Sequence, residues 1–347
     1  MSGSLRSTAS VATLPAPLTP RSTMRALVIG GTQFMGRALA RRLIDGGHDV
    51  ALLHRSAEHD LGAGVRNLQA DRADLDRVSA LLHDEPFDVV FDFAYDWQKG
   101  TTPEQVEGLA RTLHDGLGRY VFISSAGVYW TGHECDEDAP LVADDHPVPY
   151  VVHKASTERT LFAMHRDEGF PVTTFRPPFV HGPRQPFYRE QFFWDRLLDG
   201  RPIVLPDQGQ APMSWVYADD VARACLRAVE VPEAVGEAFN VGHEEPITQR
   251  SFVEALARVA GVEPDFVPVP REAIQEAGGQ VFQEPFYFGE VLDLPPLSLS
   301  VEKIARVLDF VPTGLEEGLR QGFAWYRQQP RRTVDYAFED RLIEAVG

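Results

Sequence analysis

A serine, a tyrosine and a lysine stand at a spacing that suits proton transfer. Ser125 follows the apolar run RYVFIS, and the segment YVVHK, from Tyr150 to Lys154, opens a helical pattern. Residues four apart share one face of a helix, so we expect the Lys154 ammonium to lower the pKa of the Tyr150 phenol from about 10. With the Ser125 hydroxyl holding the reacting oxygen, the set predicts acid-base catalysis during hydride transfer.

A glycine-rich turn lies between the strand-like run MRALVIG and the helical pattern FMGRALARRLIDGG. Missing side chains there let a pyrophosphate approach the N–H groups of a helix N-terminus. A tight turn that merely needs glycine is the alternative, but the place of this motif in the first turn of the chain favours phosphate binding. The residues expected at the cofactor are Gly30, Thr32, Gln33, Phe34, Met35 and Gly36.

The end of the second strand bears on the choice of cofactor. An acid there would bind the adenosine ribose of NAD, whereas Arg55 would suit the 2′-phosphate of NADP. We therefore expect NADP in preference to NAD, the alternative being an exposed surface arginine. Asp71 and Arg72, after the third strand, are expected to border the adenine unless they belong to an ordinary polar loop.

Short apolar runs alternate with amphipathic helical stretches from residue 24 onward. This pattern predicts an α/β fold, a Rossmann-like, doubly wound parallel sheet with a smaller C-terminal substrate-binding lobe. We expect a disordered extension at 1–23, a dinucleotide-binding domain at 24–180, a lobe interleaved with the sheet at 181–330, and a tail at 331–347.

The amino-acid composition limits the kinds of molecule that the protein is expected to bind and the compartment in which it is expected. A net charge of −18 disfavours nucleic acid and anionic membranes, which are bound through clustered Lys and Arg. Two distant cysteines fit a reducing compartment, and the prolines within 1–23 interrupt any signal-peptide core, so a cytoplasmic location is expected. The acidic segment 132–138 is interpreted as an exposed lid loop, not a metal site. A homodimer is compatible with the sequence, which does not determine the oligomeric state.

The order of the motifs resembles the extended short-chain dehydrogenase/reductases, which include sugar-nucleotide epimerases and dehydratases. The resemblance covers about residues 24–330 and rests on GGTQFMG, SSAGVY, YVVHKASTERTL, FRPPFVHGP, WVYADDVARA, FNVG and LEEGL. It implies that Tyr150 is the acid/base, that Lys154 also binds the nicotinamide ribose, and that Ser125 contacts the reacting oxygen. It further implies pyrophosphate binding at Gly30 and Gly36.

Two departures from the family pattern are informative. Gln33 replaces a glycine of GxxGxxG, and the resulting GGTxFxG is similar to a branch that includes chloroplast RNA-associated proteins. That branch often lacks the catalytic Tyr and Lys, which this chain keeps, so RNA binding is a minor alternative. Ala126 and Gly127 stand where dehydratases place an acid pair, which disfavours a 4,6-dehydratase.

The expected substrate site also differs. Phe179, Met213 and Tyr287 stand where relatives hold a sugar-nucleotide diphosphate with Asn, Arg and Arg, so a less charged metabolite is expected. His181 is expected to border the same pocket. Charge could still come from another direction, through Arg184, Arg189 or Arg250.

The sequence thus predicts an NAD(P)-dependent oxidoreductase that acts on a secondary alcohol or ketone, and not on a nucleotide sugar. The main alternative is an epimerase of a sugar or sugar nucleotide, with a transient keto intermediate. A protein that binds a cofactor or RNA without catalysis is a further alternative.

Overall fold

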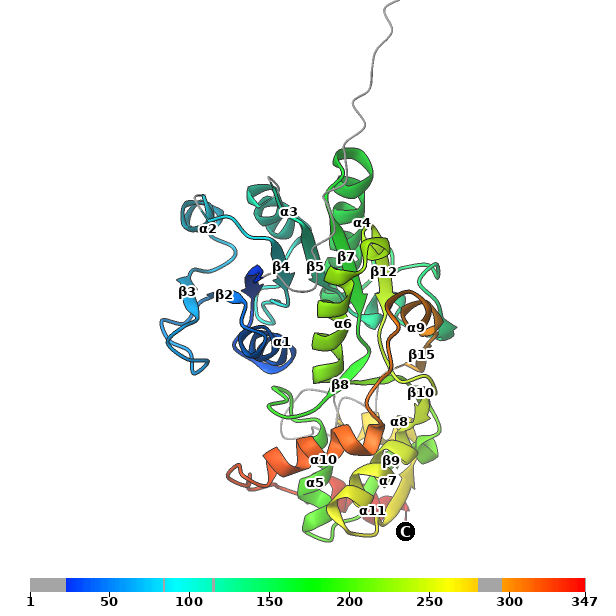
Figure 1. Cartoon of the computed structure of the whole chain (residues 1–347). Coiled ribbons are helices and arrows are strands. Elements are labelled where there is room, and N and C mark those ends of the chain that lie inside the picture. The colour runs from blue at the N-terminus through cyan, green and yellow to red at the C-terminus, as the bar shows by residue number, and fades with distance from the viewer. Residues whose placement is uncertain (1–22, 84, 114–115, 280–294, 347) are drawn as a thin grey trace, which may run out of the picture.

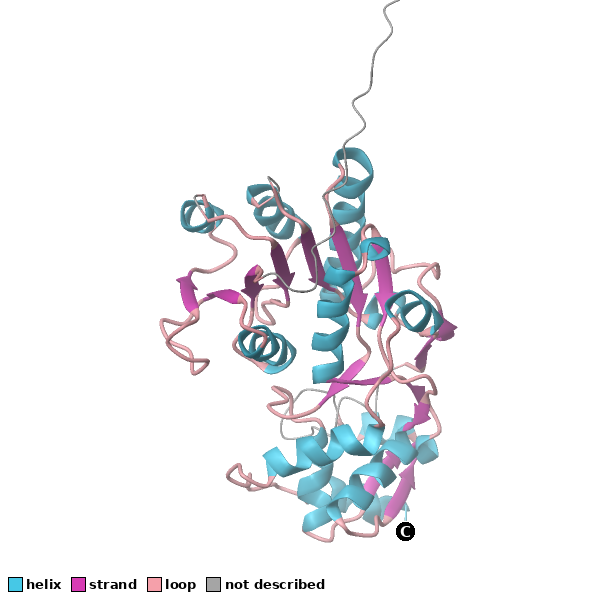
Figure 2. Cartoon of the chain, in the orientation of Figure 1, coloured by secondary structure: helices cyan, strands magenta, loops and turns pink. Residues whose placement is uncertain are grey.

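Seven parallel strands form the central sheet, in the order β3-β2-β1-β4-β5-β7-β12 (Figures 1 and 2). The computed structural model describes residues 23–83, 85–113, 116–279 and 295–346. The apolar runs MRALVIG, HDVALLHR, VRNLQAD, FDVVFDFA, RYVFISSA and PVTTFRPP correctly predict β1, β2, β3, β4, β5 and β7. The strands are β1 (Arg25–Ile29), β2 (Asp49–His54), β3 (Arg66–Gln69), β4 (Val89–Asp92), β5 (Arg119–Ile123), β7 (Val172–Arg176) and β12 (Glu237–Asn240). Residues 1–22 of the expected N-terminal extension lie outside the described residues.

Helices cover both faces of this sheet. α1 (Phe34–Asp45) and α6 (Ala218–Glu230) share one core with Val28 and Phe91, while α2 (Leu75–Leu82), α3 (Pro103–Thr112) and α4 (Pro149–Glu168) share another with Leu27 and Val90. Neighbouring residues of one strand thus face opposite layers, as the period of two requires. Because both faces are buried, the central strands β1 and β4 are largely apolar, whereas the edge strand β3 (RNLQ) is polar and only partly buried. The predicted doubly wound α/β fold is confirmed.

The turn between β1 and α1 requires glycine at several positions. Gly30 has a φ of 81°, and a Cβ on Gly31 would lie 2.7 Å from the Leu52 side chain. A Cβ on Gly36 would collide with the carbonyl oxygen of Gly30. The first turn of α1 therefore packs directly on the backbone of the preceding turn.

A second body lies beside the sheet (Figure 1, lower half). Its core includes Trp215 stacked on Phe252, with ring centroids 3.6 Å apart. Its elements are α5 (Glu190–Leu198), β9 (Ile203–Pro206), α7 (Gln249–Ala260), β14 (Phe266–Val269), α8 (Arg271–Glu276), α10 (Leu315–Tyr326) and α11 (Ala337–Val346). The tail expected at 331–347 thus contains a helix, α11, which is held by an ion pair between the buried side chains of Arg196 and Glu339.

The chain passes more than once between the two bodies. After residue 181 it builds much of the second body, and then it returns to the sheet to form α6 and β12. Smaller elements complete the chain: β8 (Phe179–His181) pairs with β11 (Trp215–Tyr217), and a further sheet has the order β13 (Ile247–Thr248), β10 (Pro212–Met213), β15 (Leu297–Leu299), β6 (Gly132–Cys135). The remaining helices are α9 (Glu302–Leu308) and the 3₁₀ turns η1 (Ala126–Tyr129), η2 (Asp207–Gly209) and η3 (Pro232–Ala234).

The segment 132–138, expected as an exposed loop, contains strand β6. The difference arises because β15, which is distant in the sequence, supplies a pairing partner for it. Within the described part of the chain, no three His, Cys, Asp or Glu side chains gather in a way that could hold a metal ion.

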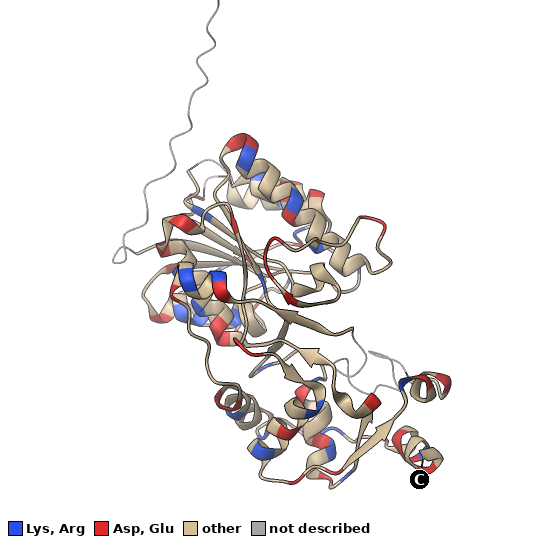
Figure 3. Cartoon of the chain, turned by 90° about the vertical axis from the view of Figure 1, so that its right-hand side faces the viewer, with Lys and Arg blue, Asp and Glu red and all other residues tan. Residues whose placement is uncertain are grey.

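Charged side chains of both signs are interspersed on the helices (Figure 3). Many of them form ion pairs, such as Arg111 with Glu107 and Glu168. Among the described residues, no helix combines the length and the apolar character needed to cross a membrane.

The packing at Gly36 can be tested by substitution. We expect Gly36→Ala to lower the free energy of unfolding by about 1–3 kcal/mol, because its methyl group would be forced against the Gly30 carbonyl. Urea unfolding followed by circular dichroism measures the change. Gly64→Ala is the matched control, since a Cβ there meets nothing within 4 Å. Equal stability of the two variants would contradict the prediction.

Candidate active site

The predicted catalytic tyrosine and lysine lie in the first turns of α4. Pro149 begins this helix at a position where the missing N–H costs nothing, and Gly169 ends it in the left-handed conformation. The Lys154 side chain is buried, and its Nζ donates a hydrogen bond of 2.6 Å to the carbonyl oxygen of Ile123. The helix is therefore joined to the last residue of β5.

Ser125 lies just beyond the same strand end. Its Oγ accepts a hydrogen bond of 3.1 Å from the backbone N–H of Gly127 at the start of η1. A Cβ built on Gly127 would lie 3.2 Å from Ser125 Oγ and 3.9 Å from Tyr150 Cε1, so the two side chains are neighbours. Interaction with Ser125 accordingly lowers the pKa of Tyr150. The structure thus brings together Ser125, Tyr150 and Lys154, as the spacing of the sequence predicts.

The sequence predicts that Lys154 lowers the pKa of Tyr150, and this prediction is wrong for this structure. The pKa of Tyr150 is raised, because burial disfavours the phenolate more strongly than Ser125 and Arg189 favour it. Burial also lowers the pKa of Lys154 to about 8. The physical reason is burial, which disfavours the charged form of both groups, while the Lys154 ammonium donates its hydrogen bond to the Ile123 carbonyl. Tyr150 is therefore held as the neutral phenol, which is the form that donates a proton.

Aromatic rings surround this phenol, and their contact with Tyr150 was not predicted from the sequence. Trp97 stacks on the Tyr150 ring with centroids 4.8 Å apart, and Tyr95 meets it edge-on at the same distance. Phe187 in turn meets Trp97 edge-on at 5.1 Å. The signal was available in part, because Tyr95 and Trp97 follow a central strand at the sheet edge where α/β proteins bind ligands.

The turn at residues 30–36 fits a dinucleotide pyrophosphate. At Gly30, Gly31 and Gly36 the neighbouring atoms leave no room for a Cβ. No side chain of these residues therefore covers the backbone of the turn. The N-cap residue Gln33 makes no side-chain capping bond, and the first turn of α1 carries no acid. Its N–H groups and the positive end of the helix dipole thus suit an anion. Thr32, Phe34 and Met35 occupy the same turn.

The residues expected near the adenosine have partners within the protein. Arg55 is exposed, and its Nη1 lies 3.0 Å from the carboxylate of Asp96. Asp71 accepts a hydrogen bond from the backbone N–H of Ala73. Arg72 is buried and forms two hydrogen bonds with Asp92, at 2.7 and 2.8 Å. Contacts of these residues with a cofactor stay predictions.

The expected substrate residues fall into different environments. Phe179 lies beside Trp215, with ring centroids 5.2 Å apart, and beneath the Arg189 guanidinium. His181 is fully buried against Tyr217, and burial holds its pKa well below the ordinary value. Met213 is also buried, in β10. His181 and Met213 therefore contribute to packing of the interior, while Tyr287 lies outside the described residues.

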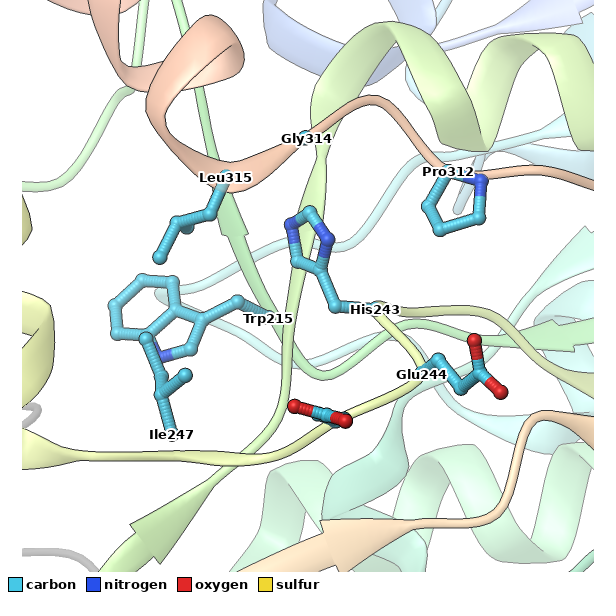
Figure 4. Close-up of a pocket in the computed structure, with 8 residues that line it drawn as sticks. Trp215, His243, Glu244, Ile247, Pro312, Gly314 and Leu315 are labelled. Atoms are coloured by element: carbon cyan, nitrogen blue, oxygen red, sulfur yellow. The ribbon is translucent and has the colours of Figure 1, made fainter.

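A surface pocket of roughly 300 Å³ lies in the second body (Figure 4). Trp215, Ile247 and Leu315 form its apolar wall, and His243 and Glu244 add polar groups. None of the residues that the sequence predicts for catalysis or cofactor binding lines it. This pocket is therefore distinct from the site at Tyr150.

Comparison with known proteins gives consistent matches over most of the chain. Residues 26–242 match the sequence model described as "NAD dependent epimerase/dehydratase family". A chloroplast stem-loop binding protein of 41 kDa from Arabidopsis thaliana is 30% identical, over 93% of this chain and 85% of its own length. A 2-alkyl-3-oxoalkanoate reductase from Stenotrophomonas maltophilia is 26% identical, over 86% and 98%. Other relatives are named as enzymes of UDP-sugars.

Solved structures show the same fold. A UDP-glucuronic acid 4-epimerase from Bacillus cereus, in complex with UDP-glucuronic acid and NAD, superposes with a TM-score of 0.71. The match covers 88% of this chain and 99% of the epimerase at 21% identity. At that identity the likeness supports the architecture alone.

The buried Lys154 should make stability depend on pH. Its pKa is about 8 in the folded protein, below the unfolded value of 10.5, so the folded state releases the proton first as the pH rises. Stability of the wild type should therefore rise by about 2 kcal/mol between pH 7 and 9.5, relative to Lys154→Met. Urea unfolding of both proteins, stripped of cofactor, measures this difference. A constant difference across that range would contradict the assigned pKa.

Proposed function

Because the chain belongs to the NAD dependent epimerase/dehydratase family, among the extended short-chain dehydrogenase/reductases, we propose that it transfers hydride between a nicotinamide cofactor and a secondary alcohol or ketone. The observation that carries the proposal is the convergence of three groups: Ser125 at the end of β5 lies beside Tyr150, and Lys154 joins their elements.

The chemistry divides between cofactor and protein. The nicotinamide, when bound, supplies the hydride that reduces the carbonyl carbon, or accepts it in the reverse direction. Tyr150 donates the proton to the carbonyl oxygen, so that hydride and proton together yield the alcohol. Ser125 donates a hydrogen bond to the same oxygen and orients it. Lys154 fixes the position of the helix that carries Tyr150, through its hydrogen bond to the Ile123 carbonyl.

We propose a substrate other than a nucleotide sugar, although several relatives are named for UDP-sugars. Phe179 and Met213 offer no charge-assisted hydrogen bond to a diphosphate, and Met213 is buried. The relative named 2-alkyl-3-oxoalkanoate reductase acts, by its name, on a keto acid with an alkyl chain, which carries no diphosphate. The aromatic surroundings of Tyr150 support such a substrate.

An epimerase is the second candidate, because relatives carry that name. The same groups would then form a transient ketone and return the hydride to its other face. An epimerase leaves the nicotinamide absorbance unchanged at completion, whereas a reductase consumes NADPH or NADH in a one-to-one ratio. The stem-loop binding relative raises RNA as a further ligand, but the interspersed charges of Figure 3 do not favour it.

The proposed role of Tyr150 has a direct test. We expect Tyr150→Phe to lower turnover at least about 100-fold, because only the hydroxyl that moves the proton is removed. Cofactor affinity, measured by calorimetry, should stay within about twofold. Tyr336→Phe is the control, since the Tyr336 hydroxyl donates a hydrogen bond to Asp199 beside α5 and has no part in the proposed site. Wild-type turnover in Tyr150→Phe would refute the mechanism.

We also propose that NADP is preferred, on the basis of Arg55 at the end of β2. Arg55→Gln should raise the KM for NADPH about tenfold and leave the KM for NADH unchanged, because only NADP carries the 2′-phosphate. Arg77→Gln, which alters an exposed arginine on α2, is the matched control. A wild type that uses NADH better than NADPH would show that the ion pair with Asp96 satisfies Arg55 instead.

A further inference from the structure

A pocket of roughly 300 Å³ has no part in the proposed hydride transfer (Figure 4). Distant parts of the chain form its wall: the start of β11, the loop that follows β12, the first residue of β13 and the turn that leads into α10. Since β12 belongs to the central sheet and α10 to the second body, the pocket borders both bodies. Its volume suits a small metabolite, because ligand pockets begin at about this size.

Two nitrogen atoms in the pocket wall are buried without a hydrogen-bond partner among the described residues. One is Nε1 of Trp215, a side chain that is only 1% exposed. The other is Nε2 of His243, and burial lowers the pKa of this ring, so that its neutral form is favoured. An indole N–H can only donate, and a buried donor without an acceptor is costly. A ligand oxygen bound at Trp215 would remove this cost.

The N-terminus of α10 adds further donors to the same wall. Its N-cap residue, Gly314, has no side chain that could accept a hydrogen bond from the first N–H groups of the helix. The acids of the first turn, Glu316 and Glu317, are each paired with an arginine, which partly offsets their charge. The positive end of the helix dipole and the Trp215 N–H therefore both favour a carboxylate oxygen.

The opposite charge preference occurs at the rim of the pocket. Glu244 and Glu245 are exposed, line the pocket and form no ion pair within the part of the chain that the structure describes. The described residues that line it include no Lys or Arg. In the view of Figure 4, Glu244 and Leu315, the first residue of α10, lie on opposite sides of the His243 ring. The pocket thus favours a cation on one side and an anion on the other.

We propose that this pocket binds a free amino acid with an apolar side chain. The carboxylate would accept hydrogen bonds from Trp215 and from the first N–H groups of α10. The ammonium would pair with Glu244 or Glu245 and donate a hydrogen bond to the neutral His243 ring. A simple amine would leave the Trp215 N–H without an acceptor, and a simple carboxylate would be repelled by the rim, so both charges are required.

Matched probes test this site independently of turnover. L-Leucine is titrated calorimetrically into the full-length protein, beside 3-methylbutylamine, which lacks the carboxylate, and 4-methylpentanoate, which lacks the ammonium. We expect leucine to bind at least about tenfold more tightly than either analogue, since each analogue loses charge-assisted hydrogen bonds. Failure of leucine to bind, or equal binding of all three probes, would overturn the proposal.

Two variants locate the binding. The double substitution of Glu244→Gln and Glu245→Gln should abolish the preference for leucine over 4-methylpentanoate, because the ammonium loses its counter-charge. Trp215→Phe should weaken leucine and 4-methylpentanoate about fivefold and leave 3-methylbutylamine unchanged, because a donor to the carboxylate is lost. Melting curves establish that each variant is folded. Because both glutamates are exposed, the double variant decides the question even where Trp215→Phe is unstable.

The matched control is Glu233→Gln combined with Glu302→Gln, which changes the net charge equally at two exposed acids outside the pocket. This control should keep the wild-type order of affinities. An unchanged preference for leucine in the variant of Glu244 and Glu245 would place the binding elsewhere and overturn the proposal. Hydride transfer is measured separately, so a failure of the proposed function is distinguishable from a failure of this site.

Discussion

The hydrogen bond from the Lys154 ammonium to the Ile123 carbonyl joins the helix that carries Tyr150 to the end of a central strand. Burying an ammonium is costly unless hydrogen bonds and opposite charge compensate. Here the carbonyl accepts a short bond, and the carboxylate of Asp92 acts favourably on the charge, although burial still lowers the pKa. Because Ser125 follows Ile123 by two residues, this contact helps to position the Tyr150 helix relative to the serine.

A second buried group supports the same region from within the sheet. Asp92, the last residue of β4, accepts two hydrogen bonds from Arg72 and one of 2.8 Å from the Tyr120 hydroxyl. These contacts join the segment after β3 to the end of β4 and to Tyr120 near the start of β5. The loop that carries Trp97 begins directly after Asp92, so the aromatic residues of this loop follow a fixed point. The buried charges are paired, as a low-dielectric interior requires.

The sequence predicted whatever depends on local periodicity and spacing. Strands buried on both faces are apolar runs, and Tyr150 and Lys154 share a helix face through their separation alone. Contacts between distant segments could not be predicted in this way. They include the ion pair of Arg72 with Asp92, the pairing of β6 with β15, and the hydrogen bond of the Lys154 ammonium to Ile123. The shift in the Tyr150 pKa was misjudged for this reason, since burial by other segments outweighs a neighbour on the same helix.

The helix α4 holds Tyr150 and Lys154, and Ser125 follows the end of β5 closely, whereas longer loops supply the surroundings of these groups. Trp97 and Phe187 lie in connections, and Arg189 precedes the first residue of α5. Connections accept substitutions more readily than strands and helices, because fewer backbone hydrogen bonds depend on them. Relatives can therefore share the redox machinery while their substrates differ in charge. Similarity to enzymes of UDP-sugars therefore supports hydride transfer more strongly than it supports a particular substrate. The substrate depends on the residues around Tyr150.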